Sequence, residues 1–308
     1  MSRKLIEELN PKLYERLRLI DDSDEFFEYL AKPVKPSIRV NTLKASVEYV
    51  AERLSDYIVG KVPWCREGFY LSTDEFGGIP EHALGVIFSQ EAASMIPPLV
   101  MDLKPGMKVL DIAAAPGAKT TQIAQYMENE GCIVANDVKY ERVNILQSNL
   151  QRCGVLIATV TMKDGRYFKR FANTFDAVLV DAPCSNVGMI RKNFRHARLW
   201  RLREVYALSR LQKELLYAAY VAAKPGATIV YSTCTTDPLE NEEVIDYILK
   251  NAEVEVERID LPVKGREPIV EFEGKVYDEE VRKCLRIHPQ DNDSEAFFVA
   301  KLRKLESC

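Results

Sequence analysis

The sequence has few residues of the kinds that build disulfide frameworks or metal sites. Only seven cysteines and three histidines occur in 308 residues, and no two cysteines form a Cys-x-x-Cys pair. A disulfide framework and a zinc ribbon are therefore excluded, and a reducing cytosol is the expected environment. His82, His196 and His288 lie far apart in the chain without metal-ligand spacing, so we predict no metal.

Long apolar runs and a basic, apolar leader are also missing. The longest apolar stretch, around residues 215–223, is interrupted by Tyr217 and Tyr220 and is too short to span a membrane. The opening residues, Met-Ser-Arg-Lys, run into an acidic segment with helical periodicity, which is unlike an export signal. We therefore expect a cytoplasmic protein that does not enter a membrane.

Charge of one sign is not in excess. The formal net charge is −4 and the isoelectric point is near 5.7, so a site for RNA or DNA has to be a local basic patch. Hydrophobic residues account for 47% and charged residues for 29%, which excludes a disordered or low-complexity chain. The length suits one large α/β domain with a smaller unit attached.

A break in the apolar pattern near residues 73–90 predicts a domain boundary. Upstream, Ile6, Leu9, Leu13 and Leu17 recur at helical spacing, and residues 37–42 alternate as a half-buried strand does. We predict a small α+β N-terminal domain over residues 1–88 and a larger domain over residues 89–308.

In the larger domain, strand-like and helix-like segments alternate. The strand-like runs are residues 108–112, 132–136, 156–161, 177–181 and 228–231. Apolar strands separated by helices predict a mostly parallel, doubly wound sheet, which residues 296–302 would close. Residues 237–240, Asp-Pro-Leu-Glu, predict a helix start with an N-cap, a first-turn proline and a capping-box glutamate.

Small and acidic residues follow the first three of these strands, where doubly wound sheets bind ligands. The loop from Asp111 to Thr121 fits neither the phosphate-loop nor the dinucleotide-loop spacing, so a ligand loop and a plain turn both stay open. Asp137 suits a ribose diol or a helix cap. Asp164 suits an adenine amino group or an ordinary Asp-Gly turn.

Two further strand ends each carry a cysteine. Cys184 follows Asp181-Ala182-Pro183, and Cys234 follows Ser232-Thr233. One cysteine at a strand end is more often packed core than a nucleophile. Two such cysteines, at what we expect to be adjacent strands, favour nucleophilic chemistry.

These segments together resemble the RNA cytosine-5 methyltransferases of the RsmB/Nop/Sun family, in its archaeal, tRNA-directed form. The matching stretches are DIAAAPGAKT at 111–120, ND at 136–137, KDGR at 163–166, DAPCSNVG at 181–188 and STCTTDPLENE at 232–242. The resemblance implies S-adenosylmethionine as cofactor and a class I, Rossmann-like methyltransferase fold with seven strands, joined to an N-terminal domain that helps to hold RNA.

The resemblance also implies roles for individual residues. Asp137 would bind the ribose, Asp164 the adenine end, and Asp181 would lie where cofactor and base meet. Cys234 would be the nucleophile and Cys184 would assist product release. The implied cofactor-binding residues are Ala113, Ala114, Ala115, Pro116, Gly117, Ala118, Lys119, Asp137, Arg142, Asp164 and Asp181.

Covalent catalysis explains why a thiol is needed. Carbon 5 of cytosine is a poor nucleophile until a thiolate adds to carbon 6 and makes it enamine-like. We expect Asp181 to share a proton with ring nitrogen 3 if burial raises its proton affinity. One departure from the family concerns this site, because Asn186 stands where glycine is usual and tolerates a left-handed backbone less freely.

A local basic patch follows Cys184. Residues 191–203 contain six basic residues and no acidic one, with Phe194 and Trp200 between them. Such a run is usually a solvated helix face, but its place beside the cysteine loop favours phosphate contacts and base stacking. The predicted RNA-binding residues are Arg39, Arg191, Lys192, Arg195, Arg198 and Arg201.

We therefore predict a monomeric RNA cytosine-5 methyltransferase that acts on tRNA or, next, on rRNA. The target base has to be unpaired or flipped out of a duplex. Two alternatives stay open. One is a catalytically silent RNA-binding assembly factor of the same fold, and the other is a DNA cytosine-5 methyltransferase.

Overall fold

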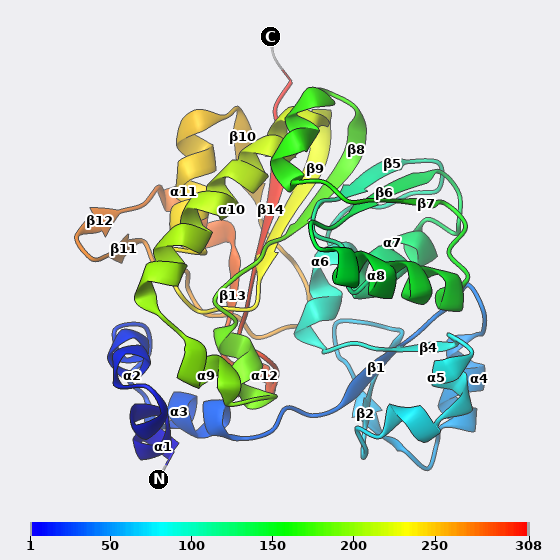
Figure 1. Ribbon diagram of the computed structural model, residues 1–308, viewed down its shortest axis with the longest axis horizontal. Helices are drawn as coiled ribbons and strands as arrows, with labels where there is room; N and C mark the ends of the chain where they lie inside the picture. Colours follow the sequence, from blue (N-terminus) through cyan, green and yellow to red (C-terminus); the bar gives the residue numbers. More distant parts are fainter. Residues whose placement is uncertain (1, 307–308) are drawn as a thin grey trace. The chain divides into compact units, whose positions relative to one another are not determined.

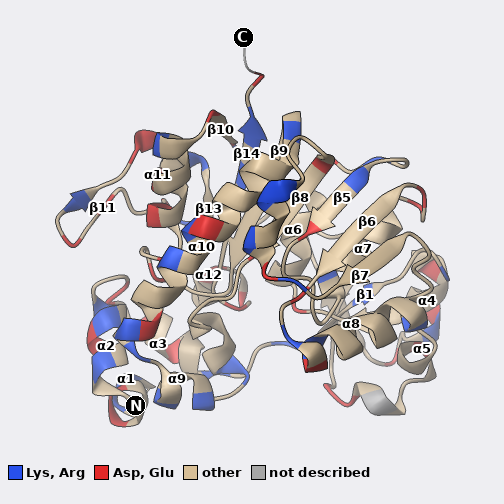
Figure 2. Ribbon diagram, turned by 45° about the horizontal axis from the view of Figure 1, so that its top comes forward, with Lys and Arg blue, Asp and Glu red and all other residues tan. Residues whose placement is uncertain are grey.

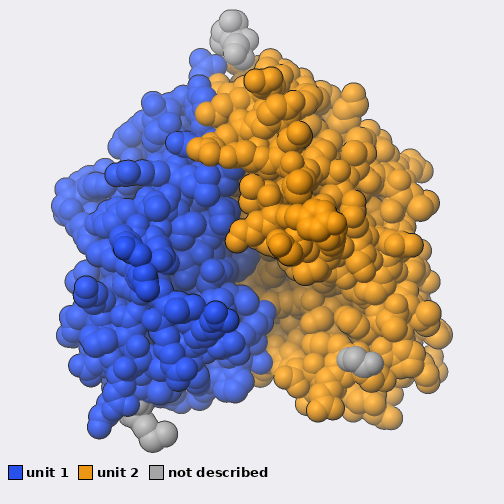
Figure 3. Space-filling model, viewed as in Figure 1, with its two compact units in different colours: residues 1–34, 182–217, 231–302 blue, residues 35–181, 218–230, 303–308 orange. Residues whose placement is uncertain are grey.

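The computed structural model describes residues 2–306, so Cys308 lies outside the described part (Figure 1). The chain forms two compact units, each assembled from segments far apart in the sequence (Figure 3). The first unit contains residues 1–34, 182–217 and 231–302. The second unit contains residues 35–181, 218–230 and 303–308.

Helices and short strands make up the first unit. Its helices are α1 (Ser2–Leu9), α2 (Pro11–Arg18), α3 (Asp24–Ala31), η4 (Val187–Arg191), α9 (Arg195–Leu199), α10 (Leu202–Ala222, which continues into the second unit), α11 (Glu242–Asn251), η5 (Glu279–Lys283) and α12 (Pro289–Asn292). Its strands are β10 (Val254–Glu257), β11 (Glu271–Phe272), β12 (Lys275–Val276), β13 (Leu285–Ile287) and β14 (Phe297–Lys304, whose last two residues belong to the second unit).

The predicted N-terminal helices belong to this first unit. Their helical stripe packs with residues from the middle of the chain in one core, made of Ile6, Leu13, Leu17, Phe26, Phe27, Leu30, Val187, Ile190, Ala197, Trp200, Val205 and Leu239. The compact units thus divide the chain differently from the boundary expected near residue 88, because the apolar face of α1–α3 is buried by residues more than 150 positions away.

The second unit contains a small antiparallel sheet and the parallel part of a larger one. Its elements are β1 (Ser37–Val40), α4 (Val47–Arg53), β2 (Ile58–Lys61), β3 (Gly68–Leu71), η1 (Phe76–Gly78), α5 (Pro80–Ala83), β4 (Ile87–Ser89), η2 (Ala93–Met95), α6 (Ile96–Leu99), β5 (Lys108–Asp111), α7 (Ala118–Tyr126), β6 (Cys132–Asn136), α8 (Tyr140–Cys153), β7 (Ala158–Thr161), η3 (Gly165–Arg170) and β8 (Phe175–Asp181). The small sheet has the order β2-β3-β1-β4.

The larger sheet follows the predicted doubly wound pattern. Its strand order is β10-β14-β9-β8-β5-β6-β7, with β13 beside β14, where β9 spans Ala223–Thr233. Strands β8, β5, β6 and β7 pair in parallel, with Asp111 opposite both Ala135 and Leu179. Parallel pairing brings the carboxyl ends of these strands to one edge, which is where the predicted ligand loops begin. The closing strand expected at residues 296–302 is confirmed as β14.

The helix start predicted at residues 237–240 is wrong. Helix α11 begins at Glu242, after Asn241. Asp237 accepts a local hydrogen bond from the Leu239 backbone N–H and is also held by Arg16. Glu240 accepts from the Ser185 backbone N–H and not from the start of the expected helix. Among residues 2–306, none of the helices has the length and hydrophobicity needed to cross a membrane.

Candidate active site

The loop after β5, in the second unit, is built for close approach by a ligand. Asp111 ends the strand, is buried, and accepts a hydrogen bond from the Thr120 hydroxyl at 2.7 Å. Burial raises the pKa of Asp111 to about 7. Helix α7 starts after Gly117, whose φ of +105° strongly favours glycine. A Cβ atom at this position would also lie only 3.1 Å from the Leu146 side chain.

Asn136 ties the ends of three strands together. Its amide N–H groups donate to the carbonyls of Ile112 and Lys163, at 3.0 and 2.9 Å. Its amide oxygen accepts from the Thr161 hydroxyl and from the Lys163 backbone N–H, both at 2.9 Å. The sequence pattern pointed to Asp137 and missed this role of its neighbour, which a buried strand-end asparagine can signal.

Asp137 offers a buried acceptor beside that junction. Its side chain is 2% exposed, and within residues 2–306 its Oδ2 has no hydrogen-bond partner, although it lies 3.4 Å from the Arg142 guanidinium. Arg142 also donates to the Ala115 carbonyl and so links Asp137 to the loop after β5. A buried carboxylate oxygen without a hydrogen-bond partner fits a ribose hydroxyl.

Asp164 forms the turn that the sequence left open as an alternative. It caps η3 by accepting from the Arg166 backbone N–H at 2.9 Å, and it pairs with the Arg166 guanidinium at 2.6 Å. The hydrogen bond from Arg166 lowers the pKa of Asp164. Its expected contact with adenine stays a prediction.

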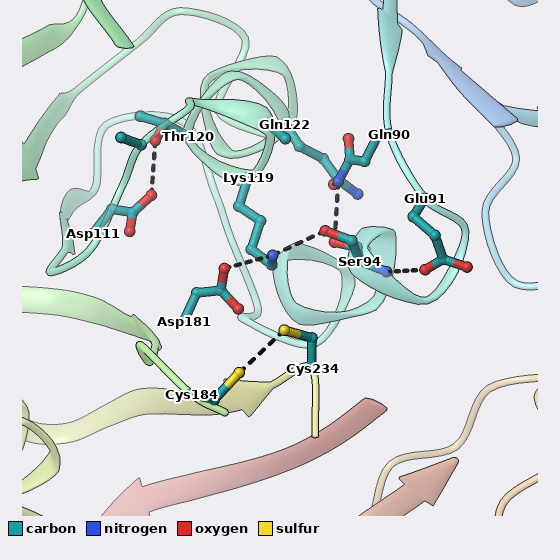
Figure 4. A network of polar contacts seen from close by, with 12 residues as sticks. Gln90, Glu91, Ser94, Asp111, Lys119, Thr120, Gln122, Asp181, Cys184 and Cys234 are labelled. Atoms are coloured by element: carbon teal, nitrogen blue, oxygen red, sulfur yellow. Dashed lines mark hydrogen bonds and ion pairs between the residues drawn. The ribbon is translucent and has the colours of Figure 1, made fainter. Parts of the chain in front are cut away.

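Asp181, the last residue of β8, forms an ion pair with Lys119 of α7, which belongs to the same unit. Lys119 Nζ lies 2.7 Å from Asp181 Oδ2 and donates to the Ser94 hydroxyl at 2.9 Å (Figure 4). Ser94 in turn donates its backbone N–H to Glu91 at 3.2 Å. The Asp181 side chain is partly buried, with 30% of its surface exposed.

The two strand-end cysteines meet in the first unit. Cys184 Sγ lies 3.1 Å from Cys234 Sγ (Figure 4). Two contacts join their loops: the Gly188 backbone N–H donates to the Cys234 carbonyl at 2.9 Å, and the hydroxyls of Ser185 and Thr235 lie 2.9 Å apart. The prediction that both cysteines lie together is therefore confirmed as geometry.

Glu240 and Gln212, whose roles sequence reasoning missed, bind the backbone of the Cys184 loop. Glu240 Oε2 accepts from the Ser185 backbone N–H and from the Gln212 amide, both at 2.9 Å. Gln212 also donates to the Pro183 carbonyl at 2.8 Å. Burial raises the pKa of Glu240 to about 7. Their signal in the sequence is weak, because polar residues in helices and turns are usually solvated.

The basic segment after the cysteine loop is only partly available to a ligand. Lys192, Arg195, Arg198 and Arg201 are exposed, and Lys192 pairs with Glu295 at 2.5 Å. Figure 2 shows Lys and Arg positions in blue along α9. Trp200 is buried in the core, so base stacking on its ring is contradicted.

Arg191 and Arg39 correct the predicted RNA track. Arg191 is buried and donates to the carbonyls of Lys32, Pro33 and Ser294, while pairing with Asp293 at 2.6 Å. Arg39 has no exposed surface and donates to Gln90, to Thr121 and to the Ala118 carbonyl. Both guanidinium groups are enclosed by protein acceptors, so neither reaches a phosphate.

Metal chemistry has no evident site in the described residues. Among residues 2–306, no group of three or more His, Cys, Asp or Glu side chains is arranged to hold a metal ion. His288 is buried against Asp21, in keeping with a structural role.

Comparisons with known proteins cover nearly the whole chain. A sequence profile described as "16S rRNA methyltransferase RsmB/F" matches residues 98–303, and one described as "N-terminal domain of 16S rRNA methyltransferase RsmF" matches residues 11–92. The tRNA (cytosine(49)-C(5))-methyltransferase of Pyrococcus abyssi is 57% identical over 300 residues, which cover 96% of each chain.

More distant relatives and solved structures are also methyltransferases. Ribosomal RNA small subunit methyltransferase F of Erwinia tasmaniensis is 40% identical over 315 residues. The match covers 96% of this chain but 64% of that protein, so this chain spans only part of that relative. The crystal structure of a methyltransferase homolog protein from Pyrococcus horikoshii has a TM-score of 0.87 at 35% identity, covering 97% of both chains.

Proposed function

The chain belongs to the 16S rRNA methyltransferase RsmB/F family, and we propose that it methylates carbon 5 of a cytosine in transfer RNA. The observation that carries the proposal is the thiol pair, Cys184 and Cys234, held 3.1 Å apart on two strand-end loops. A single thiol suffices to form an adduct with a base. A second thiol beside it suits an enzyme that also has to dismantle that adduct.

The cofactor is S-adenosylmethionine, which supplies an electrophilic methyl group when bound. The loop after β5 fits it, because Ala113, Ala114 and Ala115 leave the backbone open to a ligand and Gly117 turns the chain into α7. Asp137 would accept hydrogen bonds from the ribose hydroxyls on Oδ2, which has no hydrogen-bond partner in the described residues. Arg142, which contacts both Asp137 and the Ala115 carbonyl, would fix the position of this carboxylate relative to the loop.

Each catalytic residue has one task in the proposed reaction. The Cys234 thiolate forms a bond to carbon 6 of cytosine, and carbon 5 becomes nucleophilic enough to accept the methyl group. A base then removes the proton from carbon 5, the electron pair re-forms the ring double bond, and the bond from carbon 6 to Cys234 breaks. Cys184, or a water that it orders, would handle that proton.

Asp181 and Lys119, both in the second unit, would act on ring nitrogen 3 of the base. The Asp181 carboxylate would hold ring nitrogen 3 through a shared proton as negative charge builds up in the adduct. Lys119 Nζ lies 2.7 Å from that carboxylate and would hold it in place. Stabilisation of a developing charge by a fixed ion pair suits this step.

The exposed arginines Arg195, Arg198 and Arg201 would bind RNA phosphates, with Lys192 at the edge of the same run. Transfer RNA is the proposed substrate because the relative that is 57% identical is a tRNA methyltransferase. We also propose that the protein acts in the cytoplasm as a monomer, needs no metal, and has its RNA-holding domain within residues 1–88.

Transfer of a labelled methyl group from S-adenosylmethionine to unmodified tRNA, rRNA and DNA tests this function. Bisulfite sequencing then identifies the methylated cytosine. Cys234→Ala should abolish transfer, whereas Cys132→Ala, which changes a partly buried cysteine outside the pair, should leave it intact. Labelling that survives Cys234→Ala would rule out the nucleophile. Binding of RNA without any labelling would favour the silent assembly factor instead.

A further inference from the structure

Asn186 lies in the Cys184 loop, at a position where the family usually has glycine. It adopts a left-handed backbone, with φ of +58° and ψ of +34°, as the residue before η4. Asparagine is among the few residues other than glycine that adopt this conformation. The departure from the family therefore does not disrupt the loop, and it places a carboxamide where glycine has no side chain.

That carboxamide lies against both sulfur atoms. Asn186 Oδ1 is 3.3 Å from Cys234 Sγ and 3.9 Å from Cys184 Sγ. Backbone contacts on both sides fix this arrangement, because the Gly188 N–H donates to the Cys234 carbonyl and the Ser185 N–H donates to Glu240. These contacts hold the backbone that carries Asn186 close to Cys234, so its carboxamide stays within reach of the sulfur.

We propose that Asn186 is a positioning residue for Cys234, whose sulfur it binds in both protonation states. The amide oxygen accepts the S–H of the thiol, as in the present geometry. A half-turn about the Cβ–Cγ bond brings the amide N–H to the same place, where it donates to the thiolate. A hydrogen bond from an amide N–H to a charged thiolate is stronger than one from the weak S–H donor to an amide oxygen, so Asn186 raises the thiolate fraction of Cys234.

Two substitutions separate this role from a purely conformational one. Asn186→Gly keeps a left-handed backbone without strain but removes the amide. Asn186→Asp keeps the shape and tolerates the same backbone, but its carboxylate only accepts hydrogen bonds and repels a thiolate. A residue needed only for the turn would tolerate both changes without any effect on the sulfur.

The test is the pH dependence of Cys234 alkylation by iodoacetamide in the full-length, fully reduced protein. Trypsin places Cys234 alone in residues 214–250, Cys184 alone in 171–191 and Cys132 alone in 120–139, so mass spectrometry resolves each site. The Cys132 peptide is the internal reference. Far-ultraviolet circular dichroism verifies that each variant is folded.

We expect Asn186→Gly to raise the pH midpoint of Cys234 alkylation by about one unit, roughly a tenfold loss of thiolate below the midpoint. Asn186→Asp should raise it further, and Cys132 should not change. A midpoint for Asn186→Gly equal to that of the wild type overturns the proposal. If that variant does not fold, an unshifted midpoint in Asn186→Asp overturns it instead.

This inference depends on the proposed function only for the name of the nucleophile. Alkylation requires neither RNA nor cofactor, so a failure of methyl transfer and a failure of the Asn186 proposal would be separate results.

Discussion

Glu240 gives the sharpest prediction, because a buried carboxylate holds the Cys184 loop at a measurable energetic cost. Its folded-state pKa is raised from 4.5 to about 7 by burial, which disfavours the charged form. Both of its hydrogen bonds end on Oε2. Glu240→Gln therefore keeps an acceptor for Ser185 and Gln212 while removing the charge.

The raised pKa fixes the sign of the effect. The folded protein binds the Glu240 proton more tightly than the unfolded chain, so its contribution is complete below pH 4.5 and is lost as the pH rises through about 7. At about 1.4 kcal/mol per pKa unit, the loss is about 3 kcal/mol in total, and roughly 2.5 kcal/mol of it falls between pH 5 and pH 8. Glu240→Gln has no carboxyl group at this position, so its unfolding free energy does not include this pH-dependent loss.

Denaturant-induced unfolding of both proteins at several pH values measures the difference. The unfolding free energy of Glu240→Gln minus that of the wild type should increase by about 2–3 kcal/mol when the pH is raised from 5 to 8. A constant offset is also expected, because the new amide N–H replaces Oε1, which has no partner in the described residues. Parallel pH profiles would refute the reasoning.

The remaining predictions concern cofactor, adduct and RNA. Asp137→Ala should raise the Kd for S-adenosylmethionine by roughly 10- to 100-fold in calorimetry, and an unchanged Kd would remove Asp137 from the site. Cys184→Ala should accumulate a denaturation-resistant protein–RNA adduct on gels, absent when Cys234→Ala is added. Charge reversal at Arg198 and Arg201 should lower the salt slope of RNA binding by about one per contact without changing Tm. Arg191→Ala should instead lower Tm by several degrees, because it strands buried acceptors.

Much of the fold could be predicted from apolar periodicity. The strands β5, β6, β7 and β8 were located to within three residues, since buried parallel strands are continuous apolar runs with small or acidic residues at their ends. The membership of α1–α3 in the first unit could not be predicted. Their stripe indicates a buried face but does not identify its partner, which is residues 187–205.

The site divides in the same way. Spacing and resemblance located Cys184 and Cys234 because motif residues lie at strand ends. The prediction that Arg191 binds RNA was wrong, because a sequence does not distinguish an arginine that donates to backbone carbonyls from one that faces solvent. The helix start predicted at residues 237–240 failed for a similar reason. The Glu240 carboxylate binds the Ser185 backbone N–H, and Asp237 binds Arg16 in addition to the Leu239 backbone N–H.

In the proposed mechanism the two thiols need different protonation states at different steps. Cys234 would lose a proton before it attacks carbon 6, and the group that ends the reaction would accept the proton of carbon 5. Charging two sulfur atoms 3.1 Å apart at the same time would be costly. Glu240 fixes the backbone on one side of the loop, and Asn186 serves either protonation state on the other. A rigid loop with an adaptable amide lets the proton move between steps while the sulfur atoms stay in place, which a glycine at position 186 would leave to solvent.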